Sequence, residues 1–158
     1  MTTQPNTSGR LRFATLIVLA VAAVFAATVA SAATDAGRTT VKAHSSSLGK
    51  ILVDAKGRTL YLFDKDTRNK SACSGLCATY WPPLLTHGKP MARAGAKASL
   101  LGTTRRSDGS MQVTYAGHPL YRFALDTKAG QTSGEGLDDF GAKWDAVSPS
   151  GKSVEKSD

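Results

Sequence analysis

Short runs rich in β-branched and aromatic residues alternate with polar turns through most of the chain. Four of them are "KILVD" (50–54), "TLYLF" (59–63), "MQVTY" (111–115) and "PLYRF" (119–123). Gly57 lies between the first two and Gly117 between the last two, where a hairpin turn needs a positive φ. The pattern therefore predicts two β-hairpins. "SLLGTT" (99–104) adds a further strand before the second hairpin.

The second strand of each hairpin carries the same motif, Leu-Tyr-x-Phe-x-x-Asp-Thr, at an offset of 60 positions. The matching pairs are Gly57 and Gly117, Tyr61 and Tyr121, Phe63 and Phe123, Asp66 and Asp126, and, after the register slips by three, Trp81 and Trp144. A duplicated unit of this size cannot bury its apolar face alone, so two copies are expected to share a core. We predict a mainly β fold in which two tandem β-hairpin-plus-loop repeats, with short helical turns, pack into one small domain.

Side chains alternate between the two faces of a strand, which puts Tyr61 and Phe63 on one face and Tyr121 and Phe123 on the corresponding face of the second copy. We expect both aromatic faces to be buried, with each Trp lying against its own hairpin. The alternative is an aromatic platform that binds a sugar or a partner chain.

Asp66 and Asp126 follow their strands directly, before a polar loop. A carboxylate at this position accepts hydrogen bonds from the backbone N–H groups of the next residues and caps the turn. Cation binding by carboxylates and loop carbonyls is the alternative, although no Asp-x-Asp-x-Asp-Gly ladder is present.

The first 32 residues have the layout of a secretory signal peptide. Arg10 and Arg12 precede an apolar run (14–30), and Ala30-Ser31-Ala32 offers a cleavage site. An uncleaved membrane anchor is the alternative, because this run is about long enough to span a bilayer. After it we expect a flexible tether (33–46), a two-repeat β domain (47–151, with repeat 1 at about 47–90 and repeat 2 at about 99–151) and a disordered tail (152–158).

The charge balance is basic but diffuse. Arg10 and Arg12 leave with the leader, so 20 basic residues become 18 against 12 acidic ones, a net charge of +6. The basic residues are scattered, without the focused stripe that nucleic-acid binding uses. We expect no nucleic-acid partner and no membrane span after cleavage. A cell-envelope polyanion or a protein is the candidate partner, and a merely solvated surface is the alternative.

Cys73 and Cys77 are the only cysteines. Export implies an oxidising compartment, and residues four apart on one helical turn have Cα atoms about 6 Å apart, within disulfide range. We expect a disulfide that fixes a local turn. The alternative is a redox or copper(I) site that uses these thiols with His87 or Met91. A zinc signature and a haem-attachment motif are both missing, so no cofactor is expected.

The sequence offers no catalytic constellation. The three histidines, His44, His87 and His118, lie in separate segments, and no Gly-x-Ser-x-Gly elbow occurs. These observations favour an exported, non-catalytic structural or binding module of the bacterial envelope, with an envelope redox or copper-handling protein as the alternative.

The doubled motif, followed by "CSGLCATYWPPL" (73–84) in the first copy and "GAKWDAVSPSG" (141–151) in the second, resembles the bacterial secreted-repeat family, also described as predicted lipoproteins with a Tyr-x-[Phe/Trp/Tyr]-x-x-Asp motif. The resemblance covers about residues 47–151. The resemblance implies that the chain is exported, and it implies no particular activity, because the family has no agreed biochemical function. Many members have a Cys directly after the leader, but this chain reads "VASAATDAG" (29–37) there. A lipid anchor is therefore not expected, and the chain is either released into the periplasm or medium or retained by an uncleaved leader.

Overall fold

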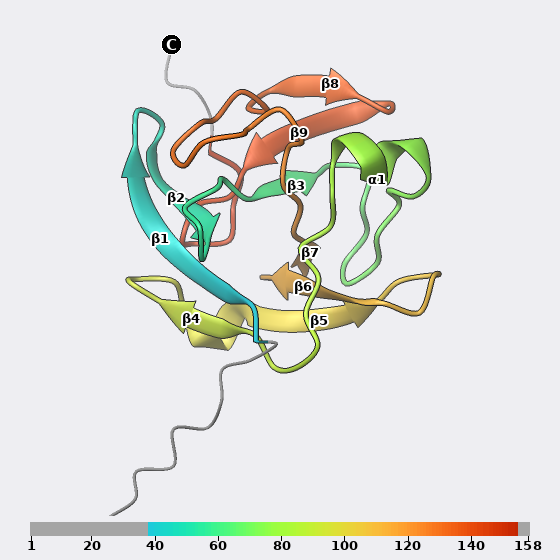
Figure 1. Cartoon of the computed structure of the whole chain (residues 1–158), viewed down its shortest axis with the longest axis horizontal. Coiled ribbons are helices and arrows are strands. Elements are labelled where there is room, and N and C mark those ends of the chain that lie inside the picture. The colour runs from blue at the N-terminus through green and yellow to red at the C-terminus, as the bar shows by residue number, and fades with distance from the viewer. Residues whose placement is uncertain (1–37, 155–158) are drawn as a thin grey trace, which may run out of the picture. The chain divides into compact units, whose positions relative to one another are not determined.

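The computed structural model describes residues 38–154 (Figure 1). This part of the chain contains nine strands, one α-helix and one 3₁₀ helix, joined by turns and loops. In chain order they are β1 (Thr40–Ser46), β2 (Gly49–Asp54), β3 (Tyr61–Phe63), α1 (Leu76–Tyr80), β4 (Met91–Arg93), η1 (Ala98–Leu100), β5 (Leu101–Arg105), β6 (Met111–Tyr115), β7 (His118–Pro119), β8 (Leu137–Asp139) and β9 (Ala142–Ala146). The predicted mainly β, two-repeat fold is confirmed. The expected signal peptide (1–32) lies outside the described residues.

The strands form three small sheets, with orders β2-β1-β4, β3-β9-β8 and β5-β6-β7. Figure 1 shows β3 between the β8–β9 pair above it and strands β5 and β6 below it. The second and third sheets meet where the two motif tyrosines pair: Tyr61 N–H donates to the Tyr121 carbonyl at 2.9 Å, and Tyr121 N–H donates to the Tyr61 carbonyl at 3.0 Å. The two copies are therefore joined through the backbone of the motif itself.

Both predicted hairpins form, but only close to their turns. In the second copy, β6 pairs with β7 at Thr114–Pro119 and Tyr115–His118. In the first copy, β2 meets the motif strand at the bridge Val53–Thr59, with bonds from Asp54 N–H to the Arg58 carbonyl and from Leu60 N–H to the Leu52 carbonyl. Each hairpin carries a further antiparallel strand, β1 on β2 and β5 on β6. Beyond the hairpins, the motif strands pair with each other at the two tyrosines, and β3 also pairs with β9.

The expected tether (33–46) is wrong for its last seven residues, because residues 40–46 form β1. β1 is antiparallel to β2 and parallel to β4, and Val41 is fully buried. The expected tail (152–158) also begins too early, since Val154 N–H donates to the Ala146 carbonyl at 2.8 Å. Residues 33–37 and 155–158 lie outside the described part.

Two apolar clusters flank the motif strands, one on each face. The cluster on the Tyr/Phe face comprises Ile51, Val53, Tyr61, Phe63, Cys73, Cys77, Trp81, Tyr121, Phe123, Trp144 and Ala146. The cluster on the other face comprises Val41, Leu52, Leu60, Leu62, Leu84, Val113, Tyr115, Leu120 and Val147. Period-two alternation therefore divides the buried side chains between two cores, and both copies contribute to each.

Candidate functional site

The motif tyrosines and aspartates bond across the repeat boundary. Tyr61 Oη donates to Asp126 Oδ2 at 2.5 Å, and Tyr121 Oη donates to Asp66 Oδ2 at 2.7 Å. Each tyrosine thus uses the aspartate of the other copy. Because the two tyrosines also exchange backbone hydrogen bonds, the doubled motif forms one reciprocal lock, which we call the Tyr–Asp lock (Tyr61, Asp66, Tyr121 and Asp126).

The second oxygen of each carboxylate orders the loop of its own copy. Asp66 Oδ1 accepts from Ala72 N–H at 2.7 Å, and Asp126 Oδ1 accepts from Ser133 N–H at 3.0 Å. The bonded N–H groups lie six and seven residues further along the chain, not in the next residues as expected. Within residues 38–154, no three side chains of the His, Cys, Asp and Glu types gather in a metal-binding arrangement.

The expectation that each tryptophan lies on its own hairpin is incomplete, because each one contacts both copies. Each indole meets the tyrosine of its own copy edge-on, with ring centroids 5.4 Å apart for Trp81 and 5.1 Å for Trp144, but it packs more closely on the phenylalanine of the other copy. Trp144 of the second copy stacks on Phe63 of the first, with ring centroids 4.0 Å apart, and Trp81 of the first copy packs on Phe123 of the second at 4.4 Å. The two indoles stack on each other at 4.0 Å. The alternation predicts which rings are buried but carries no information about which copy covers them.

The chain after each Trp explains this exchange. Three residues beyond Trp81, Leu84 N–H donates to the Leu120 carbonyl, and the Leu84 carbonyl accepts from Val113 N–H. Three residues beyond Trp144, Val147 makes the matching pair of bonds to Leu60 and Leu52 of the first copy. Each copy therefore completes the hairpin of the other, which places its Trp over the other copy's Phe.

Three glycines fit these turns and contacts closely. Gly57 and Gly117 have φ values of 82° and 90°, as the predicted turns require. Gly134 has no such φ, but a Cβ there would lie 2.8 Å from an atom of the Trp81 ring and 3.0 Å from one of the Tyr61 ring. Sequence reasoning missed Gly134, because one glycine among several in a polar loop carries no signal of close packing.

Burial sets the protonation of the Tyr–Asp lock. It raises the pKa of Tyr61 and of Tyr121 above the usual value for a phenol, so both hydroxyls stay protonated as donors. Burial also raises the pKa of Asp66 to about 6, although the N–H of Ala72, the hydroxyl of Tyr121 and the charge of Arg106 oppose the shift. The side chains of this lock are thus held by one another, an arrangement suited to holding the fold.

Arg106 extends the lock on one side. This residue is 8 % exposed, and its guanidinium donates to Ser71 Oγ at 2.9 Å, to Gln112 Oε1 at 2.7 Å and to the Cys73 carbonyl at 2.7 Å. Ser71 Oγ also accepts from Tyr121 Oη at 2.7 Å. Sequence reasoning missed Arg106, since nothing in the neighbouring residues indicates a buried arginine.

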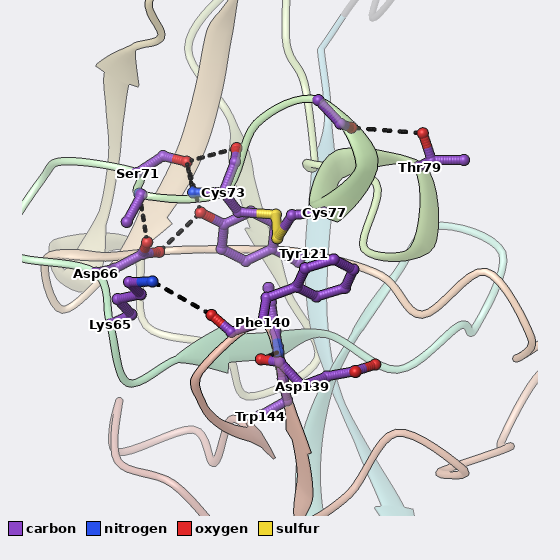
Figure 2. Close-up of a disulfide and its surroundings, with 12 residues drawn as sticks. Lys65, Asp66, Ser71, Cys73, Cys77, Thr79, Tyr121, Asp139, Phe140 and Trp144 are labelled. Carbon is purple, nitrogen blue, oxygen red and sulfur yellow. Dashed lines mark hydrogen bonds between the residues drawn. A yellow bond between two sulfur atoms is a disulfide. The ribbon is translucent and has the colours of Figure 1, made fainter.

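Cys73 and Cys77 form a disulfide with Cα atoms 5.3 Å apart. Figure 2 shows it beside the ring of Tyr121, with Asp66 and Ser71 at the phenol oxygen. The two cysteines are 1 % and 7 % exposed. A neighbouring pocket of about 370 Å³ is lined by Cys73 together with Lys70, Ser71, Ser74, Arg105, Arg106 and Ser107.

The other residues considered for a copper site lie elsewhere. His87 is exposed and lines a separate pocket with Thr86 and Met111, and Met91 lies on β4, where its sulfur accepts from Arg38 and Arg93. Neither lines the pocket beside Cys73.

These features define a two-repeat β protein in which the shared motif joins the copies. The chain belongs to the family of secreted repeats of unknown function: the family model matches residues 42–85 and 102–148, one region for each copy. No curated protein and no solved structure matches the chain. Within residues 38–154, none of the helices has the length and apolar character needed to cross a bilayer.

Proposed function

We propose that this protein works outside the cytoplasm as a non-catalytic structural or binding module of the bacterial envelope. The observation that carries the proposal is the Tyr–Asp lock. Of the polar side chains in the repeated motif, the two tyrosines and two aspartates bond to each other and to loop backbone. They therefore stabilise the fold and are not free to act on a substrate.

The sequence supports the location. The segment 1–32 has the layout of a signal peptide that leaves a soluble mature chain. The mature chain carries a net charge of +6, which suits contact with an envelope polyanion or with an acidic protein surface.

Cell fractionation and N-terminal sequencing of the native protein test the location. We expect a chain that starts at Ala33 in the periplasm or medium. A chain that keeps residues 1–32 in the membrane fraction would show retention by an uncleaved leader.

Incubation of the purified mature chain with isolated envelope fractions tests the activity. We expect saturable retention and no chemical turnover of envelope material. A hydrolysis or transfer reaction that disappears when a single His or Asp is replaced would refute the non-catalytic role.

Redox or copper chemistry at Cys73 and Cys77 has weaker support, because both sulfur-bearing side chains lie within the apolar core and a reactive cysteine needs access. Thiol titration of the folded protein, with and without a mild reductant, distinguishes the two views. An unreactive pair is expected. A pair that reduces readily and then takes up copper(I) tightly would favour the redox alternative.

A further inference from the structure

The second copy departs from the first at one core position. Leu62, between Tyr61 and Phe63, is 4 % exposed and packs in the apolar cluster on the Leu face. The matching residue between Tyr121 and Phe123 is Arg122, which is half-buried. A leucine fits this position in one copy, so the arginine is not a requirement of the repeat fold.

Within residues 38–154, the side chain of Arg122 forms no ion pair. Its Nε is buried and makes no hydrogen bond. A buried donor without an acceptor costs about 1–3 kcal/mol, and more when it is charged. The Nε–H of Arg122 is therefore a buried donor that an oxygen acceptor would stabilise.

Among the described residues, the carboxylate that acts on Arg122 is that of Asp54, and both of its oxygens are already bonded elsewhere. Asp54 Oδ2 accepts from Arg58 Nε at 2.9 Å and lies 2.7 Å from Arg58 Nη2. Asp54 Oδ1 accepts the backbone N–H groups of Lys56 and Arg58 at 2.9 and 3.0 Å. These four contacts hold the Asp54 carboxylate on Arg58 and the turn, so Asp54 attracts Arg122 through its charge but accepts no hydrogen bond from the Arg122 Nε.

Arg122 shares a pocket of about 320 Å³ with three other basic residues, Arg38, Lys56 and Arg58, against the single acid Asp54. Burial first, and then repulsion by Arg58, lowers the pKa of Arg122, and attraction by Asp54 only partly opposes this. An oxyanion in the pocket would provide acceptors for the guanidinium and reduce the repulsion at the same time.

We infer that the Arg122 pocket binds a phosphate group, either as the free ion or within an envelope phosphodiester polymer. A guanidinium matches two phosphate oxygens at once, and pockets of about 300 Å³ and above are large enough for a small ligand. The inference rests on the proposed function, because it locates where a binding module would hold an anionic envelope component.

A lipid surface fits the pocket less well. Of the large apolar side chains that are exposed in residues 38–154, namely Leu76, Tyr80, Leu85 and Leu125, only Leu85 lines this pocket. One leucine gives little area to insert into acyl chains. Anionic vesicles therefore serve as a comparison in the test.

Isothermal titration of the mature chain with sodium phosphate, at constant ionic strength set by sodium chloride, tests the site. The variant is Arg122→Gln, and the matched control is Arg105→Gln, which removes the same charge from an exposed residue outside this pocket. We expect one phosphate to bind the wild type and the control, and Arg122→Gln to bind at least tenfold more weakly. Absence of phosphate binding, equal binding by Arg122→Gln, or an equal loss in Arg105→Gln would overturn the inference.

The fold of the variant can be checked independently. Arg122→Gln removes a half-buried cation whose burial and repulsion by Arg58 outweigh its attraction to Asp54, so its thermal midpoint without phosphate should equal or exceed that of the wild type. Arg122→Leu, which copies Leu62 of the first repeat, is expected to fold and to lose phosphate binding as well. A folded Arg122→Leu protein that binds phosphate like the wild type would contradict the proposal.

Two further titrations separate the ligand sources and the two proposals. Poly(glycerol phosphate) should compete with phosphate in an Arg122-dependent manner, whereas binding to phosphatidylglycerol vesicles alone would overturn the polymer as the source. If Arg122→Gln is retained on envelope fractions as well as the wild type, this site is wrong and the proposed function stands. If phosphate binds at Arg122 but no envelope material is retained, the proposed function fails and the phosphate site stands.

Discussion

Replacing Tyr61 with Phe tests the Tyr–Asp lock most simply, because it removes one oxygen and leaves the ring in place. Asp126 is 3 % exposed, and within residues 38–154 its carboxylate accepts from two donors, Tyr61 Oη and Ser133 N–H. Loss of the phenol leaves a buried carboxylate that is short of a donor and that water cannot easily reach.

The cost follows from the charge and burial of the acceptor. Hydrogen bonds to charged groups contribute about 1.5–3 kcal/mol, and removing one partner of a buried charged group costs more, so we expect Tyr61→Phe to lower the free energy of unfolding by about 3 kcal/mol. Tyr121→Phe should cost less, about 1–2 kcal/mol, because its acceptor Asp66 is only half-buried and water can replace the phenol.

Urea unfolding of a double-mutant cycle measures the bond itself. Tyr61→Phe combined with Asp126→Asn should show a coupling energy of about 2 kcal/mol, since both single changes break the same contact. The matched control pairs Tyr61→Phe with Asp66→Asn, the aspartate of the same copy, and should show a coupling below about 0.5 kcal/mol. Stronger coupling of Tyr61 to Asp66 than to Asp126 would refute the exchanged arrangement.

Three further predictions concern the surroundings of this lock. Gly134→Ala should destabilise the protein by about 2 kcal/mol or more through overpacking against two buried rings. Gly88→Ala should be close to neutral in the same urea experiment, because its φ is ordinary and the added Cβ would meet only the flexible Arg38 side chain, at 4.0 Å. Burial raises the folded-state pKa of Asp66 to about 6 from the ordinary value of 3.8, so its contribution to stability is full below pH 3.8 and is lost as the pH rises through 6. Asp66→Asn should remove this pH dependence, and an unchanged pH profile would contradict the shift. Replacing Cys73 and Cys77 with Ser should lower the unfolding free energy by only about 2 kcal/mol, as expected for a short loop, and a protein that fails to fold would show a larger role for the disulfide.

The strand pattern predicted the buried faces well, because burial on a pleated strand depends on local alternation. Tyr61 and Phe63 belong to one core and Leu62 to the other, and Gly57 has the positive φ that its turn requires. These properties depend on residues that are close in sequence, so they can be predicted from a single sequence.

The exchange between copies could not be predicted in this way. Trp81 and Trp144 occupy the same place in similar repeats, so the sequence is compatible with either tryptophan covering the phenylalanine of either hairpin. The path of the chain after each Trp determines which phenylalanine it covers. β1 was missed for a different reason: its alternation is weak, and Val41 is the one fully buried residue in a segment rich in serine. Its pairing with β2 and β4 is a tertiary effect that overrides composition.

The central claim is that neither repeat is complete without the other, and splitting the chain tests it most directly. The fragments 38–94 and 95–154 meet at an exposed turn between β4 and η1, where both Ala94 and Gly95 are exposed. Near-UV circular dichroism should show no fixed aromatic packing in either fragment alone and a native-like spectrum when the two are mixed. A native-like aromatic spectrum from one isolated fragment would contradict the account.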